Sequence, residues 1–198
     1  MTAGPSEVLI VADKSSNPEW LASDLLGQAE HDQLAQCILI SKDKNILEKT
    51  KKEVFEQLKN LPRSSIAKKS LMMNGILIYA NSDKKIIEIT NKIGPEHLEL
   101  NVKNYKSFVA KIKNAGSVCL GKYAVMAMTD YGAPGSNHVL PTNMTSKYSS
   151  GLNVSEFMKK ISYITLSKKG IDKLGPSVIT LANYEGLVGH AQSVIKRI

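Results

Sequence analysis

The feature that most restricts the fold of this chain is a regular alternation of short apolar runs with amphipathic stretches. Four apolar runs are present, at residues 7–12 (EVLIVA), 37–40, 75–80 (GILIYA) and 117–120. Continuous apolar runs of this length are typical of strands buried on both faces of a sheet. The stretches between them have the composition and spacing of helices, at residues 17–31, 45–61, 64–73, 83–93 and 104–114. Because strand and helix alternate up to about residue 121, the sequence predicts an α/β fold, with a parallel sheet and flanking helices.

The remainder of the chain has a different character. Residues 123–149 show weak periodicity and many Gly, Pro, Asn and Thr residues, which is typical of a long functional loop or of disorder. After this loop we expect a helix near 154–161, a strand near 163–167 and a final helix from 176 to about 198. The pattern predicts an α/β domain at residues 1–150 and a small, mainly helical segment at residues 151–198. With only four expected strands, residues 1–150 are either a small domain or the second part of a larger one.

The charge of the chain bears on its partners. The formal net charge is +8, almost all of it from lysine, because the only arginines are Arg63 and Arg197. Nucleic-acid-binding proteins usually cluster their basic residues and use arginine for bidentate contacts. Here lysines and glutamates are interleaved along helix faces, so a solvated surface explains the charge better than nucleic-acid binding. A weak attraction for anionic substrates remains open.

The cysteines and the apolar runs indicate a cellular compartment. Cys37 and Cys119 each lie inside an apolar run, where cysteine commonly acts as a small hydrophobic residue. Nothing indicates a disulfide framework, so we expect a reducing, cytoplasmic location. The first residues lack the pattern of a signal peptide, and no apolar run approaches membrane-spanning length. We therefore expect no membrane partner.

The first predicted helix carries the earliest sign of a functional site. Asn17 suits the N-cap and Pro18 suits the first helical position. A stripe of leucines then ends in Gln28 and His31, which are three residues apart and can reach one point off the helix, as two ligands of a metal would. The alternative is a helix end that emerges into solvent.

Polar residues with suitable chemistry also follow later in the chain. Glu96 and His97 stand side by side after a predicted helix end, and such a pair can supply a general base and a group that activates water; the alternative is an exposed pair without a role. Because ligands of parallel α/β sheets gather at the carboxyl ends of the strands, we expect this pair there. Asp130 and His190 are suitable metal ligands, one by oxygen and one by nitrogen. Glu185 could meet a substrate or lie on a solvated helix face.

Several ordered motifs together resemble the histidinol dehydrogenase family. They are GPSEVL at 4–9, DLLGQAEH at 24–31, GPEHL at 94–98, Asp130-Tyr131, NHVLPT at 137–142 and the pair Glu185 and His190. The family enzyme is a zinc-dependent, NAD-linked homodimer that oxidises L-histidinol through the aldehyde to L-histidine. The match runs from Gly4 to the end of the chain. The family's chain begins well before the position of Met1, so the resemblance implies that the NAD-binding residues and half of an interrupted Rossmann-like domain are missing here.

The resemblance also implies roles for individual residues. The zinc ligands would be Gln28, His31, Asp130 and His190. The general base would be His97, and Glu96 would activate water on the aldehyde. Substrate contacts would come from Ser6, His97, Glu185 and the zinc ligands. His138 would lie near the substrate, at the end of a loop that is one residue longer than the family's usual spacing.

Three hypotheses follow for the function of the chain. The first is the zinc- and substrate-binding part of histidinol dehydrogenase, shared between the two chains of a homodimer and inactive by itself. The second is a catalytically inactive fragment that acts as a metal-binding or assembly module. The third, a basic nucleic-acid-binding domain, depends only on the charge of +8.

Overall fold

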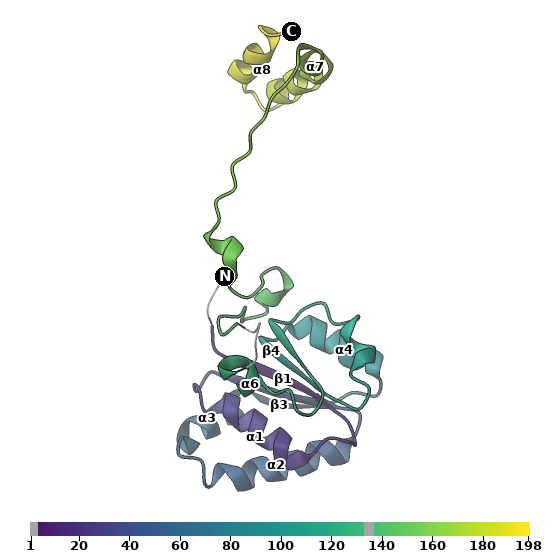
Figure 1. The fold of residues 1–198 in the computed structure, drawn as a ribbon, viewed down its shortest axis with the longest axis vertical. Helices are drawn as coiled ribbons and strands as arrows, with labels where there is room; N and C mark the ends of the chain where they lie inside the picture. The colour runs from purple at the N-terminus through teal and green to yellow at the C-terminus, as the bar shows by residue number, and fades with distance from the viewer. Residues whose placement is uncertain (1–3, 133–136) are drawn as a thin grey trace. The chain divides into compact units, whose positions relative to one another are not determined.

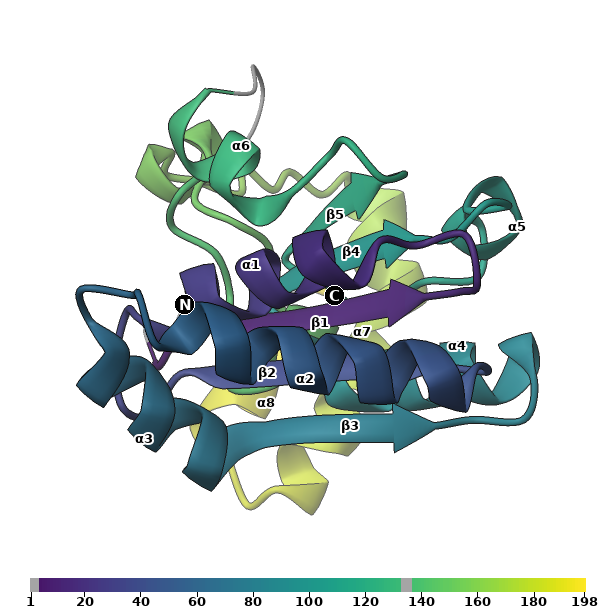
Figure 2. The same cartoon turned by 90° about the horizontal axis from the view of Figure 1, so that it is seen from below.

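The computed structural model describes residues 4–132 and 137–198, in two compact units, Met1–Glu156 and Phe157–Ile198. The first unit contains a parallel five-stranded sheet in the order β3-β2-β1-β4-β5 (Figures 1 and 2). Its strands are β1 (Glu7–Ala12), β2 (Gln36–Ser41), β3 (Gly75–Tyr79), β4 (His97–Asn101) and β5 (Ser117–Leu120). The predicted fold class, a parallel α/β sheet with flanking helices, is confirmed.

Helices cover both faces of this sheet. The longer helices are α1 (Pro18–Ala29), α2 (Lys44–Leu58), α3 (Ser64–Asn74) and α4 (Asp83–Ile93), and a single turn forms α5 (Lys106–Val109). Because successive side chains of a strand point to opposite faces, β1 contributes to two separate apolar cores. Val8 and Ile10 pack with α1, α2 and α3, whereas Leu9 and Val11 pack with α4 and Phe108 of α5. Strand β1 is therefore buried along its whole length, as its apolar sequence predicted.

The helix ends follow the local sequence signals. The Asn17 side chain accepts a hydrogen bond from the Glu19 N–H, and Pro18 is the first residue of α1. Ser82 caps α4 in the same way, and α4 ends at Gly94, whose φ of 61° lies in the left-handed region that glycine adopts without strain. This turn leads directly through Pro95 into β4.

Strand β4 was not among the predicted strands, although its sequence alternates. Leu98 and Leu100 belong to the core under α4. His97 and Glu99 occupy the alternate positions and therefore point to the other face of the sheet, toward α1. An alternating strand next to continuous apolar ones places polar groups inside the protein, where they need partners.

Beyond β5 the structure differs from the sequence prediction at several places. Residues 104–114 form only the one turn of α5, and the segment expected to be a loop contains α6 (Met126–Tyr131) and a 3-10 turn, η1 (Thr145–Lys147). The helix expected near 154–161 is a 3-10 turn, η2 (Val154–Phe157). The strand expected near 163–167 is wrong: these residues are exposed and have no strand to pair with among the described residues.

The second unit is a pair of helices, α7 (Lys168–Tyr184) and α8 (Val188–Ile195), where one helix from residue 176 was predicted. Helix α7 begins earlier because the Ser167 side chain caps it by accepting the Gly170 N–H, and it continues through Pro176. Helix α7 ends just before Gly186, which has a φ of 75°. Within the described ranges, no helix is long and apolar enough to cross a membrane.

Candidate active site

The predicted catalytic pair lies at the amino end of the sheet. Glu96 immediately precedes β4, His97 is its first residue, and Glu7 opens the neighbouring strand β1. The expectation that Glu96 and His97 lie at the carboxyl end is therefore wrong. The prediction places the pair after a helix end, whereas residues 97–101 form a strand that begins with His97.

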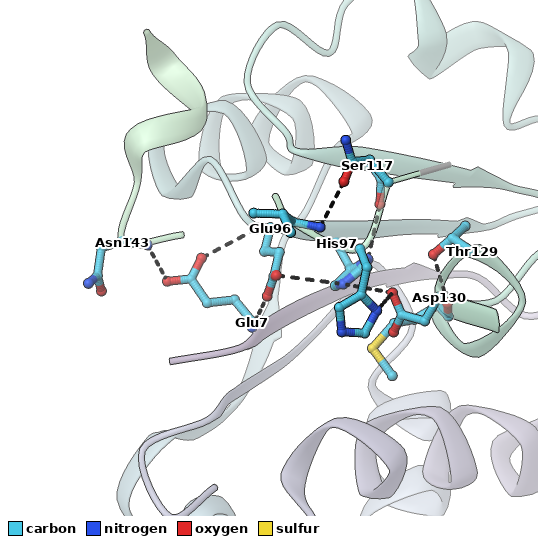
Figure 3. A network of polar contacts seen from close by, with 11 residues as sticks. Glu7, Glu96, His97, Ser117, Thr129, Asp130 and Asn143 are labelled. Carbon is cyan, nitrogen blue, oxygen red and sulfur yellow. Dashed lines mark hydrogen bonds and ion pairs between the residues drawn. The ribbon is translucent and has the colours of Figure 1, made fainter. Parts of the chain in front are cut away.

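The imidazole of His97 is held by contacts at both of its nitrogens. His97 Nδ1 is 3.0 Å from Ser117 Oγ, on the neighbouring strand β5. His97 Nε2 is 3.9 Å from Glu96 Oε1 and 3.8 Å from Asp130 Oδ1. Figure 3 shows both carboxyl groups directed toward the ring. The side chains of His97 and Asp130 are only 4% and 5% exposed, so these charges interact with little screening by water.

Glu96 and Glu7 hold each other through reciprocal hydrogen bonds. Glu96 Oε2 accepts the Glu7 N–H at 2.9 Å, and Glu7 Oε2 accepts the Glu96 N–H at 3.3 Å. The other oxygen of Glu7 accepts the Asn143 N–H at 2.9 Å (Figure 3). One oxygen of Glu96 is therefore anchored by β1, and the other remains directed at His97.

Burial moves the proton affinities of the pair in opposite directions. It raises the pKa of Glu96 to about 7, and the negative charges of Glu7 and Asp130 add to this increase. Burial also lowers the pKa of His97, although the charge of Asp130 acts in the opposite direction. Near neutral pH, Glu96 can therefore exchange a proton, and neutral His97 can accept one.

Asp130 comes to this site from α6, which packs between α1 and β4. Its Oδ1 atom is buried without a hydrogen-bond partner and lies 3.7 Å from His138 Nδ1. The His138 side chain is mostly exposed, and its ring lies 6.5 Å from that of Tyr131. Of the longer loop between Asp130 and His138, residues 133–136 lie outside the described part of the chain.

The other predicted ligands of the first unit lie near the end of α1. Gln28 is 1% exposed, and its Nε2 atom has no hydrogen-bond partner. His31 is exposed just beyond the helix, and its charge contributes to the lowered pKa of His97. Ser6 is partly buried and its carbonyl oxygen accepts the Gln36 N–H. The end of α1 therefore carries one buried and one exposed polar group toward the amino end of the sheet.

The remaining predicted residues belong to the second unit. Glu185 is the C-terminal cap residue of α7, and His190 lies on α8; both are exposed. Among the described residues, no group of three or more His, Cys, Asp or Glu side chains is arranged to hold a metal ion. The absence of such a group does not test the predicted ligand set, because Gln28 is not of these residue types and His190 belongs to the second unit. The set of four zinc ligands stays a prediction.

Sequence reasoning did not single out three residues that shape the site. Glu7 and Asn143 position Glu96, and Ser117 orients His97. Glu7 did leave a signal, because a charged residue opens an otherwise apolar run. Ser117 and Asn143 left none, because only the pairing of β4 with β5 and the path of the later loop bring them here.

The fold and the site together define a class: a parallel α/β protein with a buried carboxylate–imidazole centre suited to proton transfer. Comparison with known proteins makes this more specific. A family model described as histidinol dehydrogenase matches residues 1–198. The chain belongs to the histidinol dehydrogenase family, which confirms the resemblance seen in its motifs.

Individual relatives agree with this assignment. The chain is 74% identical over 198 residues to a histidinol dehydrogenase of Pelagibacter ubique, covering 100% of this chain and 46% of the relative. A relative from Methanocaldococcus jannaschii is 45% identical over 196 residues, 99% of this chain and 45% of the relative. The crystal structure of histidinol dehydrogenase from Elizabethkingia anophelis superposes with a TM-score of 0.84 at 44% identity, over 100% of this chain and 45% of that one. The chain thus spans about half the length of the relatives it matches.

Proposed function

We propose that this chain supplies the substrate and zinc site of a histidinol dehydrogenase, which oxidises L-histidinol through L-histidinaldehyde to L-histidine in the cytoplasm. The observation that carries the proposal is the buried group of Glu96, His97 and Asp130, in which an imidazole and a carboxylate with a pKa near neutrality face each other. The NAD-binding residues would come from the N-terminal half that the family's longer chains carry. The family membership and the spacing of the motifs support this division.

The residues present fit a zinc ion. Asp130 Oδ1 and the Gln28 side-chain amide are buried with unpartnered polar atoms, which is costly unless a ligand or ion satisfies them. An amide can present its oxygen by rotating half a turn about its last bond. We infer that Gln28, His31 and Asp130 would hold zinc together with His190. When bound, zinc would hold the substrate's imidazole and amino nitrogens and so orient the alcohol for oxidation.

In the first oxidation, His97 would act as the general base. Its Nδ1 atom is engaged with Ser117, so Nε2 is the atom available to accept the hydroxyl proton of histidinol. The carbon that bears this hydroxyl group loses a hydride, which carries two electrons, and the product is the aldehyde. NAD supplies the hydride acceptor when it is bound. Asp130, 3.8 Å from Nε2, would stabilise the imidazolium that forms.

In the second oxidation, Glu96 would act on water. Its Oε1 atom would accept a proton as the water oxygen bonds to the aldehyde carbon, giving the hydrated aldehyde as its alkoxide anion. Loss of a second hydride from that carbon then gives the carboxylic acid. A carboxylate with a pKa of about 7 is well matched to this role, because it is ionised in part of the population and still basic.

We further propose that the enzyme is a homodimer in which Glu185 and His190 serve the site of the other chain. The second unit supports this, because in α7 and α8 only Gly175, Ala182 and Ala191 are buried. Large apolar side chains such as Leu181 and Val188 are 63% and 60% exposed. Exposed apolar surface of this kind is typical of segments that dock on another protein surface.

The test measures NADH formation with histidinol, NAD and zinc. The 198-residue chain alone should give no turnover, and the chain joined to the family's N-terminal half should turn over and lose activity when zinc is chelated. Turnover by the chain alone would contradict the proposed division between the two halves. A joined protein that binds zinc but forms no NADH would instead identify an inactive relative.

A further inference from the structure

Two carboxyl groups, on the partly buried Asp24 and the fully buried Glu99, meet near the candidate site and are not used by the proposed mechanism. Asp24 lies on α1, and Glu99 lies on β4 with 1% of its surface exposed. Their carboxyl groups lie close enough for each to shift the pKa of the other. Asp24 Oδ2 and Glu99 Oε2 are nevertheless buried with no N–H or other hydroxyl group of the described chain to satisfy them.

This arrangement requires a proton. Two ionised carboxylates carry only acceptors, so they cannot hydrogen-bond to each other, and in a buried position they would repel. Burial raises the pKa of Asp24 to about 6 and that of Glu99 to about 8, and the charge of Asp24 contributes to the second value. One proton, held mainly by Glu99, therefore satisfies both groups near neutral pH.

The pair also connects the elements that carry the site residues. Asp24 stands one helical turn before Gln28 on α1. Glu99 stands two residues after His97, on the same face of β4. Met126 is the first residue of α6, and its N–H donates to the other oxygen of Glu99 at 2.8 Å.

Helix α6 in turn carries Asp130 one turn beyond Met126. Helix α6 has six residues and packs against α1 and β4. Since none of its own side chains caps its amino end, the bond from Met126 to Glu99 is the fixed point at that end. The position of Asp130 relative to His97 therefore depends on Glu99.

We propose that Asp24 and Glu99 are positioning residues that share one proton and so tie α1, β4 and α6 together beneath Gln28, His97 and Asp130. The effect on catalysis rests on the proposed function, whereas the shared proton does not. Asp24 holds the Glu99 carboxyl group in one orientation, and Glu99 in turn fixes the start of α6 by accepting the Met126 N–H. Cys119, which faces the pair and Asp130, remains a neutral thiol because burial raises its pKa to about 12.

The experiment compares amide and apolar replacements in the chain joined to its N-terminal half. In E99Q and D24N, an amide N–H replaces the shared proton, and Gln or Glu at position 99 still accepts the Met126 N–H. Both variants should keep kcat within about threefold of the wild type, since hydrogen bonds are conserved. E99M loses both the bond to Asp24 and the bond from Met126, and its zinc affinity and kcat should each fall about 10- to 100-fold, as is usual for residues that support a metal site. D24L loses only the bond between the two carboxyl groups, so both quantities should fall by a smaller factor. Glu48, an exposed acid on α2, provides the matched control E48Q.

Infrared difference spectra test the proton directly. Wild type minus E99Q, and wild type minus D24N, should each show the carbonyl stretch of a protonated carboxyl group, and wild type minus E48Q should not. Absence of this band in the first two spectra would overturn the shared proton, even if E99M does not fold. Equal kcat and zinc affinity in folded E99M and E99Q would overturn the positioning role. If the wild type oxidises no histidinol, the proposed function fails while the infrared result still decides the pairing.

Discussion

The two ends of the same parallel sheet differ in how completely their polar groups are paired. At the carboxyl end, Asp13 accepts the Lys103 N–H, Ser16 donates to the Asn101 carbonyl, and Lys42 forms a 2.5 Å ion pair with Asp83. A hollow of about 390 Å³ lies there, and Asp13, Lys42 and Asp83 in its lining have the partners just named. At the amino end, Gln28 and Asp130 are buried with unpartnered polar atoms.

This difference shows where the sheet can do chemistry. Sites in parallel sheets usually form at carboxyl ends, in particular where the strand order reverses, and here β1 and β4 mark that reversal. There, Asp13, Ser16, Lys42 and Asp83 have partners within the protein, so these groups are not left free for a ligand. At the amino end, Glu96 Oε1 and His97 Nε2 face each other at 3.9 Å, which is beyond hydrogen-bond distance. The pKa of Glu96 is raised and that of His97 is lowered. The candidate site therefore lies where buried polar atoms lack hydrogen-bond partners, and not at the end of the sheet where sites of this fold class usually form.

The largest expected effects come from the amino end. In the joined enzyme, H97N should slow the first oxidation by about 10²- to 10⁴-fold, because the general base is removed. E96Q should slow oxidation of supplied L-histidinaldehyde more than oxidation of histidinol to the aldehyde. Single-turnover measurements of each half-reaction would separate the two steps. Equal losses in both steps for both variants would contradict the division of roles.

A smaller effect at the same end should come from Glu7. E7Q removes a negative charge that raises the pKa of Glu96, so Glu96 should lose its proton at lower pH. The acid limb of the pH profile for aldehyde oxidation should therefore move to lower pH. Glu7 also accepts hydrogen bonds from the N–H groups of Glu96 and Asn143, and in E7Q the amide NH₂ of the glutamine would face one of them. The loss of that hydrogen bond should reduce kcat by about tenfold. E19Q, an exposed acid at the carboxyl end, is the control and should leave the profile in place; an unmoved profile in E7Q would refute the effect of Glu7 on Glu96.

The pH dependence of stability should also reflect the amino half of the sheet. The raised pKa values of Asp24, Glu96 and Glu99 mean that the native state binds protons more tightly than the unfolded state. Their contribution to stability is complete below about pH 4, the unfolded-state value, and is fully lost once the pH has passed the native-state values of about 6 to 8. The free energy of unfolding should therefore fall as the pH rises from about 4 to about 8. Urea unfolding of the chain at a series of pH values would measure it. The fall should be shallower in E99Q, and parallel curves would contradict the assignment.

The smallest effect is expected at the carboxyl end. Lys42 and Asp83 are about half exposed, and ion pairs of this kind contribute little. K42M should change the free energy of unfolding by about 0.5 kcal/mol or less and leave kcat unchanged. A loss of activity in K42M comparable to that in E7Q would remove the contrast between the two ends.

The sequence by itself determined the fold class, the family and the local signals that begin and end helices. Continuous apolar runs predicted buried strands, and Asn17, Ser82 and Gly94 marked helix ends, because capping depends on groups only a few residues apart. Strand β4 is not among the predicted strands, because Leu98 and Leu100 alternate with His97 and Glu99 and do not form a continuous apolar run.

Only the tertiary structure decided which end of the sheet holds the site and which distant groups meet there. Glu7 contacts Asn143 across 136 residues, and His97 contacts Ser117 because β4 pairs with β5. Asp24 and Glu99 meet because α1 packs on the face of the sheet to which Glu99 points, and the sequence does not indicate this pairing. Proton affinities depend on burial and on nearby charges, which are properties of the packed structure, so no local pattern could have predicted them.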